Sequence, residues 1–194
     1  MDGPGQLPLV IDAAGWLDGV RRLPSPNCDD RPGGMEPELV VVHGISLPPG
    51  RFGGPWIDDL FTNRLDPRVD PYFAQIQGLR VSAHLLIRRD GTAVQYVSLL
   101  RRAWHAGVSE FQGRVRCNDF AIGIELEGTD TLPYEPHQYQ TLARLIGAIR
   151  ERWPAIDRAR IVGHCHIAPG RKTDPGTAFD WSQLWQMLDN SKHC

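Results

Sequence analysis

A short apolar run at residues 39–43, LVVVH, constrains the fold of this chain more than any other stretch. The residues from Leu39 to Val42 are apolar without a break, which is typical of a strand buried on both faces of a sheet. The run is predicted to stop at His43-Gly44. Because functional groups are often mounted at strand ends, His43 is a candidate for chemistry.

Two further segments predict strands. Residues 81–99, VSAHLLIRRDGTAVQYVSL, predict a β-hairpin that turns at Asp90-Gly91, since this dipeptide suits the positive φ of tight turns. In FAIGIELE, residues 120–127, the apolar side chains alternate with Gly123, Glu125 and Glu127. One face of that strand is therefore apolar, and the other carries two carboxylates.

Helical spacing of apolar residues predicts three helices. The first covers WIDDLFTN, residues 56–63, and the longest begins at Pro136 and ends before Pro154. The last is a short helix that begins after a cap at Asp180.

The chain is long enough for one domain with a real core. Residues 1–38 show little periodicity, and the proline-rich part at 24–34 predicts an extended surface arm that wraps the domain.

The charge balance and the cysteines indicate the setting of the protein. Lysine and arginine total 21 against 23 aspartates and glutamates, so neither nucleic acid nor an anionic membrane is expected as the main partner. No apolar run approaches the ~20 residues of a membrane span, and no signal peptide is expected. The cysteines form no CxxC pair, so we expect free thiols and a cytoplasmic location. We also expect a monomer. The four cysteines are scattered along the chain. They are Cys28, Cys117, Cys165 and Cys194.

Residues 161–176, IVGHCHIAPGRKTDPG, form a candidate metal site. An apolar strand leads to His164, and a Gly/Pro-rich loop then carries Lys172 and Asp174. Hydrolytic zinc sites take three protein ligands and leave one position for water, so His164 and Asp174 need one more ligand, for which His43 is the best candidate. Lys172 is then close enough to stabilise an oxyanion, although it could also be a plain surface lysine.

His166 and Glu125 each have two interpretations. In an extended segment His164 and His166 would share a face and could reach one metal, with Cys165 pointing away; a supporting or surface role for His166 is favoured. A buried Glu125 would have a raised pKa suited to proton transfer near neutrality, while the alternative is a solvated or salt-bridged strand residue. Trp104 lies in a polar, glycine-containing stretch, where an aromatic side chain is more easily spared for a ligand.

Several co-linear motifs resemble one family over nearly the whole chain. They are HGISLPPGRFGG, LRVSAHLLIRRDGTAVQYV, RAWHAGVS, CNDFAIGIELEGTDTLPY and GHCHIAPGRKTDPGTAFDW, together with PSPNCDDRP near the N-terminus. The chain is similar to the type 2 N-acetylmuramoyl-L-alanine amidases, in particular the cytosolic 1,6-anhydro-N-acetylmuramyl-L-alanine amidases of Gram-negative bacteria. HExxH, GxSxG, P-loop and GxGxxG motifs do not occur.

The resemblance implies an α/β (α+β mixed) fold with a central mixed β-sheet flanked by helices, in which residues 39–194 form a zinc amidase domain. It implies that Zn²⁺ is bound by His43, His164 and Asp174. It also implies that Glu125 and Lys172 form the catalytic pair.

The implied substrate is a small molecule, an anhydromuropeptide cut between the lactyl group of the muramyl sugar and L-alanine. Arg80, Trp104 and Arg116 match positions near substrate in similar enzymes, and guanidinium groups can grip the carboxylates of the stem peptide. Two residues depart from the family pattern: Gly44 stands where Asn is common, and His166 where Asp is common. A non-catalytic muropeptide-binding protein and a zinc peptidase acting within the stem peptide are the alternatives.

Overall fold

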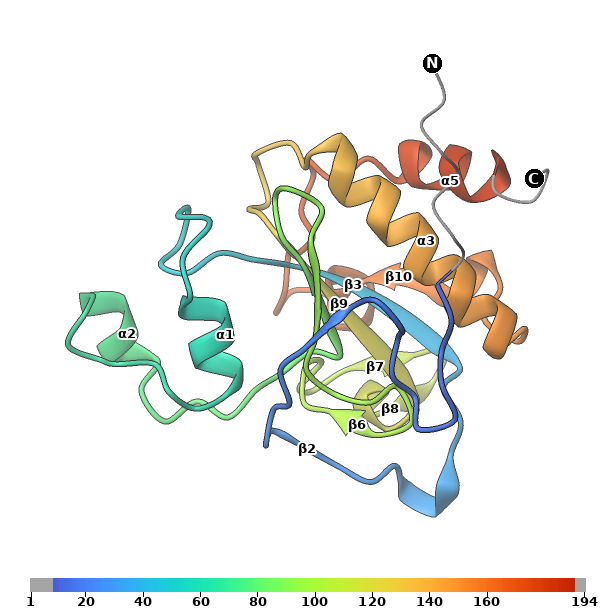
Figure 1. Cartoon of the computed structure of the whole chain (residues 1–194), viewed down its shortest axis with the longest axis horizontal. Coiled ribbons are helices and arrows are strands. Elements are labelled where there is room, and N and C mark those ends of the chain that lie inside the picture. The colour runs from blue at the N-terminus through green and yellow to red at the C-terminus, as the bar shows by residue number, and fades with distance from the viewer. Residues whose placement is uncertain (1–8, 191–194) are drawn as a thin grey trace.

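The computed structural model describes residues 9–190, and at its centre lies a six-stranded mixed sheet (Figure 1). Every neighbouring pair of strands is parallel except β4 and β5, which are antiparallel. The mixed sheet confirms the predicted fold class. In sheet order the strands are β1 (Arg21–Arg22), β5 (Ala93–Gln95), β4 (Leu85–Ile87), β9 (Ala121–Glu127), β3 (Leu39–Ile45) and β10 (Ile161–Gly163).

The central pair, β3 and β9, places two candidate site residues side by side, since His43 is in register with Glu125. The prediction that β3 is buried on both faces is confirmed, because Val40 and Val42 pack into one core cluster and Leu39 and Val41 into another. The predicted stop at His43-Gly44 is wrong. The ladder with β9 continues to Ile45, so His43 lies within the strand.

One face of the sheet is covered by α3 (Pro136–Arg152) and α5 (Trp181–Asn190), as predicted (Figure 1). A capping box between Glu135 and Gln138 begins α3, and Asp180 caps α5 by accepting hydrogen bonds from the amides of Ser182 and Gln183. Apolar side chains of β9 pack under these helices and form the larger core. They are Ile122, Ile124 and Leu126.

The other face is covered by shorter elements. Helix α1 (Trp56–Phe61) packs Ile57 and Phe61 with Leu86 of β4, and α2 (Pro71–Gln75) adds Phe73 to the same cluster. Figure 1 shows α1 and α2 standing together at one side of the sheet. The predicted β4–β5 hairpin is confirmed, with Gly91 at φ 83° in its turn.

The remaining elements are short. Two small antiparallel sheets pair β2 (Cys28–Asp29) with β6 (Arg102–Ala103), and β7 (Glu110–Phe111) with β8 (Arg114–Val115). Short helices are η1 (Pro32–Gly34), η2 (Cys117–Asp119), η3 (Arg158–Arg160) and α4 (His164–Ile167). The helical α4 contradicts the expectation of an extended His164–His166 segment, because the chain turns into a helix directly after Gly163.

The N-terminal segment is more integrated than a surface arm. Leu17 is fully buried in the main core, β1 forms one edge of the sheet, and within 24–34 Ser25, Asn27 and Arg31 are buried. Prolines keep this stretch extended, but its polar side chains find partners inside the protein. The division between an arm and a domain at residue 38 stays a prediction, and residues 1–8 lie outside the described part.

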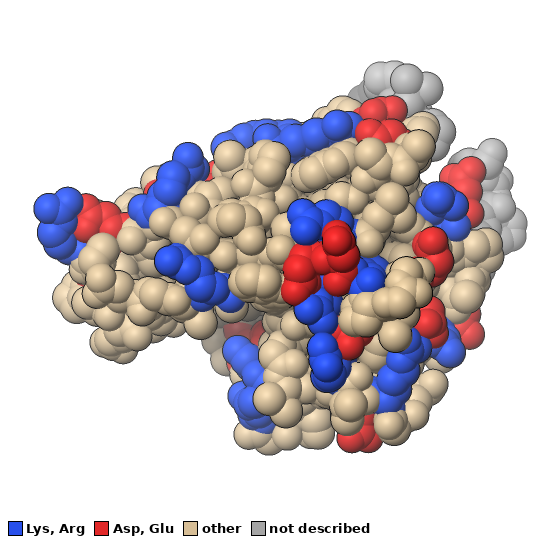
Figure 2. Space-filling model, turned by 90° about the horizontal axis from the view of Figure 1, so that it is seen from below, with Lys and Arg blue, Asp and Glu red and all other residues tan. Residues whose placement is uncertain are grey.

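Charged side chains of both signs are interspersed on the face shown in Figure 2. Some opposite charges pair directly, as where Arg102 donates hydrogen bonds to both Asp29 and Asp119. Cys28, Cys117 and Cys165 are free thiols, as predicted, while Cys194 lies outside the described residues. Within residues 9–190, no helix has the length and apolar character needed to cross a membrane.

Candidate metal centre and active site

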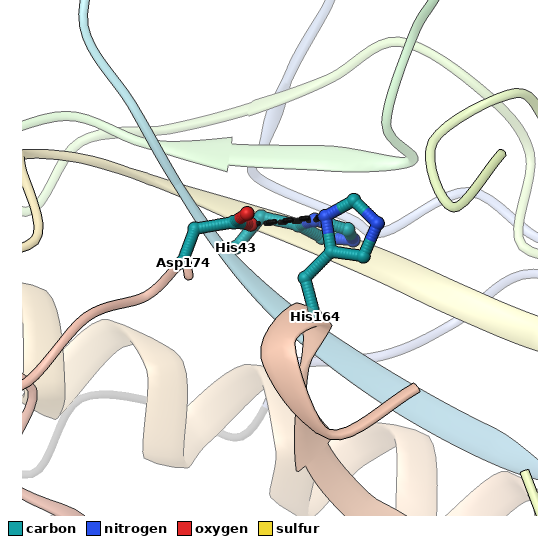
Figure 3. A group of neighbouring side chains, drawn as sticks. All are labelled: His43, His164 and Asp174. Carbon is teal, nitrogen blue, oxygen red and sulfur yellow. Dashed lines mark hydrogen bonds and ion pairs between the residues drawn. The ribbon is translucent and has the colours of Figure 1, made fainter. Parts of the chain in front are cut away.

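Three side chains from distant parts of the chain converge at the carboxyl end of β3 (Figure 3). Nδ1 of His43 lies 3.0 Å from Nδ1 of His164, and each of these nitrogens lies 3.1 Å from Oδ2 of Asp174. Both histidines are buried, and Asp174 is partly buried. The structure thus brings together all three predicted ligands.

The donor set fits a zinc ion. Zinc–ligand bonds of about 2.0–2.1 Å in a tetrahedral site separate the ligand atoms by roughly 3.3 Å, close to the distances observed here. Burial lowers the pKa of His43 to about 4, so its imidazole is neutral at pH 7 and has a lone pair to donate. Burial opposes ionisation of Asp174, but hydrogen bonds with His164 and His43 hold the pKa of this carboxyl well below its usual range.

Local structure fixes where His164 and Asp174 lie. His164 is the first residue of α4, immediately after β10, which pairs with β3. The amide of Cys165 donates to the carbonyl oxygen of Asp174 at 2.9 Å. This hydrogen bond holds the loop that carries Asp174 against the start of α4. Gly163 leaves room for this loop, since a Cβ there would lie 2.8 Å from Cδ of Pro175.

A pocket of about 290 Å³ opens beside the three ligands, and both predicted catalytic residues line it. Burial, with a further contribution from the charge of Asp174, raises the pKa of Glu125 well above 4.5, while Lys172 opposes the rise. Oε2 of Glu125 has no hydrogen-bond partner among the described residues. A buried carboxyl of this kind can hold or release a proton near neutral pH.

The three predicted substrate-binding residues are placed differently. Trp104 lines the pocket and donates from Nε1 to Asp29 at 3.1 Å. Arg80 is exposed and borders a separate small cavity, and Arg116 is exposed and ion-paired with Asp119 at 3.2 Å. Neither arginine lines the main pocket. The rest of that pocket is largely apolar, with Leu47, Leu60, Phe61, Tyr72, Ile76, Leu79 and Val81.

The two departures from the family pattern have local explanations. Nδ1 of His166 accepts a hydrogen bond from the amide of Gly163 at 2.9 Å, and its exposed ring lies beside Trp181, so it is not one of the converging donors. A Cβ on Gly44 would overlap the hydroxyl of Tyr134. That hydroxyl donates to the carbonyl oxygen of Pro175, the residue after Asp174, at 2.9 Å.

Sequence reasoning missed several residues around the ligands. His105 lies 2.9 Å from Nε2 of His43, Ala106 contacts His164, and Asn118 accepts hydrogen bonds from both of their amides. The stretch RAWHAGVS drew attention only through Trp104. Its histidine adjoins a tryptophan in a polar loop, and nothing in the spacing links it to a strand 62 residues away.

His43 on the mixed sheet, His164 on α4 and Asp174 on the following loop converge beside the buried Glu125, an arrangement typical of metal-dependent hydrolases. The family model described as N-acetylmuramoyl-L-alanine amidase matches residues 33–177, and the chain belongs to this family. The family membership expected from the motifs is therefore confirmed.

Three relatives show how close the similarity is. The chain is 62% identical over 185 residues to the 1,6-anhydro-N-acetylmuramyl-L-alanine amidase AmpD of Citrobacter freundii, covering 95% of this chain and 98% of the relative. A crystal structure of a selenomethionine AmpD derivative matches with a TM-score of 0.90 at 60% identity, over 92% of this chain and 99% of that one. The third is Escherichia coli AmiD in complex with the substrate anhydro-N-acetylmuramic acid-L-Ala-D-γ-Glu-L-Lys; it has a TM-score of 0.59 at 29% identity, over 92% of this chain and 65% of that one.

Proposed function

We propose that this amidase hydrolyses the bond between the lactyl group of 1,6-anhydro-N-acetylmuramic acid and L-alanine in muropeptides, with zinc as its metal. The observation that carries the proposal is the convergence of His43, His164 and Asp174 beside Glu125 in one pocket. The relatives named AmpD support the choice of substrate, and the substrate complex of AmiD shows that a related fold accepts an anhydromuropeptide.

Zinc is the metal that this donor set favours. Two imidazoles and one carboxylate are typical ligands of a hydrolytic zinc site, which with three protein ligands would keep one coordination position for water. When bound, zinc supplies Lewis-acid chemistry that lowers the pKa of water from 15.7 to about 7 and polarises a carbonyl group.

The residues of the chain then move the proton and hold the charge. Glu125 accepts a proton from the attacking water, because its buried carboxylate is a stronger base than an exposed one. It returns the proton to the nitrogen of L-alanine as the C–N bond breaks. Lys172, which lines the same pocket, donates a hydrogen bond to the oxyanion that develops on the lactyl carbonyl.

The apolar part of the pocket and Trp104 are proposed to hold the sugar and lactyl end of the substrate. Arg80 and Arg116 are proposed to bind carboxylates of the stem peptide, and because neither lines the pocket, the peptide must extend beyond it to reach them. Truncating the stem peptide should therefore weaken binding more than turnover, and replacing either arginine should have no further effect on the truncated substrate.

Product analysis separates this proposal from its alternatives. A defined anhydromuropeptide incubated with the zinc-loaded protein is expected to give free anhydro sugar and an intact peptide that begins with L-alanine, identified by mass spectrometry. Cleavage within the stem peptide would identify a peptidase instead. Binding without any cleavage would identify a muropeptide-binding protein, and either outcome would contradict the proposal.

We also propose that the enzyme acts as a monomer in the cytoplasm, on a small molecule and without nucleic acid. Free thiols and balanced charge support this setting. Sedimentation of the purified protein and fractionation of cells that produce it test the two statements separately. A stable dimer, or recovery outside the cytoplasm, would contradict them.

A further inference from the structure

Residues 105 and 106 contact both histidines of the metal-ligand group from the side away from Asp174. Nε2 of His43 lies 2.9 Å from Nδ1 of His105, and Nε2 of His164 lies 3.1 Å from the carbonyl oxygen of Ala106. One dipeptide thus meets the second ring nitrogen of each ligand.

These contacts decide which tautomer each ligand adopts. A carbonyl oxygen can only accept, so the 3.1 Å contact with Ala106 favours a proton on Nε2 of His164, which leaves Nδ1 with a lone pair facing Asp174. Nη2 of Arg171 lies farther from the same nitrogen, at 3.4 Å, and donates to the Ala106 oxygen at 2.7 Å. For His43 to present a lone pair at Nδ1, its proton must also sit on Nε2 and be donated to Nδ1 of His105. Metal-binding histidines generally donate their second nitrogen in this way, most often to a carboxylate, a carbonyl or water.

The protonation state of His105 follows from the same contact. Its Nδ1 must be the acceptor, so its own proton sits on Nε2, a buried atom without a hydrogen-bond partner among the described residues. In this site, the acceptor for Nε2 of His43 is therefore a second imidazole.

The dipeptide is itself held by Asn118 in η2. The side-chain oxygen of Asn118 accepts hydrogen bonds from the amides of His105 at 3.1 Å and Ala106 at 2.8 Å. Behind the His105 ring, Gly123 of β9 leaves the space that a side chain would fill, since a Cβ there would press on the imidazole. The ring is therefore confined between β9 and His43.

We propose that His105 and Asn118 are positioning residues that fix both histidine ligands with Nδ1 unprotonated and directed at the metal. His105 acts directly on His43, and Asn118 acts on both ligands through the backbone of residues 105 and 106. This inference rests on the proposed metal-dependent function. Its consequence is a loss of metal affinity when either acceptor is removed, even though neither residue is a ligand.

Two matched pairs of variants test the inference. His105→Phe keeps a ring but removes the acceptor, whereas His105→Asn places an oxygen where Nδ1 stood. Asn118→Leu keeps the shape but removes the acceptor, whereas Asn118→Asp retains it. Zinc affinity is measured by chelator competition on the full chain, cobalt-loaded protein is compared by its visible spectrum, and urea unfolding of the metal-free variants checks that they fold.

Removing either acceptor is expected to weaken zinc binding by about 10- to 100-fold and to alter the cobalt spectrum, while the matched variants lose less than about 10-fold. Wild-type affinity in both His105→Phe and Asn118→Leu would overturn the inference, as would equal losses in the matched variants, because packing alone would then explain them. If His105→Phe does not fold, the Asn118 pair decides. Failure of the wild-type chain to bind zinc would instead overturn the proposed function.

Discussion

At the level of single residues, the site combines groups whose protonation states are set by burial and by hydrogen bonds. His43 is kept neutral, Asp174 is kept ionised, and Glu125 is kept basic within one pocket. Separate environments allow the carboxylate proposed as a ligand, Asp174, and the carboxyl proposed to transfer a proton, Glu125, to coexist. The roles of Glu125 can therefore be tested apart from metal binding.

Replacing Glu125 by Gln should abolish proton transfer while leaving the ligands intact. We expect kcat to fall by about 10²- to 10⁴-fold, the usual contribution of general acid–base catalysis, with zinc affinity close to that of the wild type. The measurement pairs steady-state kinetics with chelator competition. Near-normal turnover in this variant would remove Glu125 from the mechanism.

The pH dependence of stability offers a second test of Glu125 in the metal-free protein. Its folded-state pKa lies above the ordinary value of 4.5, so the folded chain binds this proton more tightly than the unfolded chain does. The stabilisation is complete below pH 4.5 and is lost as the pH rises toward the folded-state pKa.

The variant Glu125→Gln does not titrate at this position. Its free energy of unfolding should therefore exceed that of the wild type by about 1–3 kcal/mol at neutral pH, and the difference should shrink toward pH 4.5. Urea unfolding across pH 4.5–8, with the metal removed, measures it. A difference that does not vary with pH would contradict the assigned pKa shift.

Residues of the site could be predicted from the sequence only where they stand in a recognisable motif. His164 and Asp174 share one loop, and His43 ends an apolar run, so each was visible as a candidate in the sequence. His105 contacts a strand residue 62 positions away, and Asn118 accepts from amides 12 and 13 positions away, and no local pattern reveals such contacts. Arg80 and Arg116 were predicted by resemblance alone, and the geometry of the pocket does not include them.

At the scale of elements, the long helices and the central strands follow from periodicity, and the short elements do not. α3 begins with a capping box and Pro136, and Pro154 follows its last turn, so both of its ends can be predicted from the sequence. α4 is only 4 residues long, too short to show a period, and its turn comes from tertiary pairing of β10 with β3. This is why an extended His164–His166 segment was expected in its place.

The N-terminal segment was also hard to predict, because its burial depends on a charged side chain. Arg31 is 5% exposed and donates hydrogen bonds to the carbonyl oxygens of residues 99, 118, 119 and 121. The guanidinium therefore fastens the segment to β9 and to the loop that carries Asn118. Composition alone made this stretch look like a surface arm.

Replacing Arg31 by Met removes these donors while keeping much of the side-chain volume. We expect the free energy of unfolding to fall by roughly 3 kcal/mol, since several buried carbonyl groups lose a charged partner. Urea unfolding of the full chain measures the change, and Arg22→Met on an exposed residue serves as the control. A loss no greater than that of the control would show that the segment is only loosely attached.

At the scale of the whole molecule, the metal site joins β3, α4 and the loop before α5, so metal binding should stabilise the entire fold. A ligand that binds only the folded state at 100 times its Kd adds about 2.7 kcal/mol. Thermal unfolding should therefore shift upward on addition of zinc and downward on chelation. The variant His164→Ala should show neither shift, and a shift of wild-type size in that variant would place the metal elsewhere.

We propose that hydrolysis depends on one metal ion held by His43, His164 and Asp174. Reconstitution of the metal-free enzyme with zinc tests it most directly, with the release of L-alanyl peptide from an anhydromuropeptide measured at each addition. Activity is expected to be absent without metal and to rise linearly to a plateau at one equivalent per chain. Full activity of the metal-free enzyme, or an unchanged titration in Asp174→Ala, would contradict the claim.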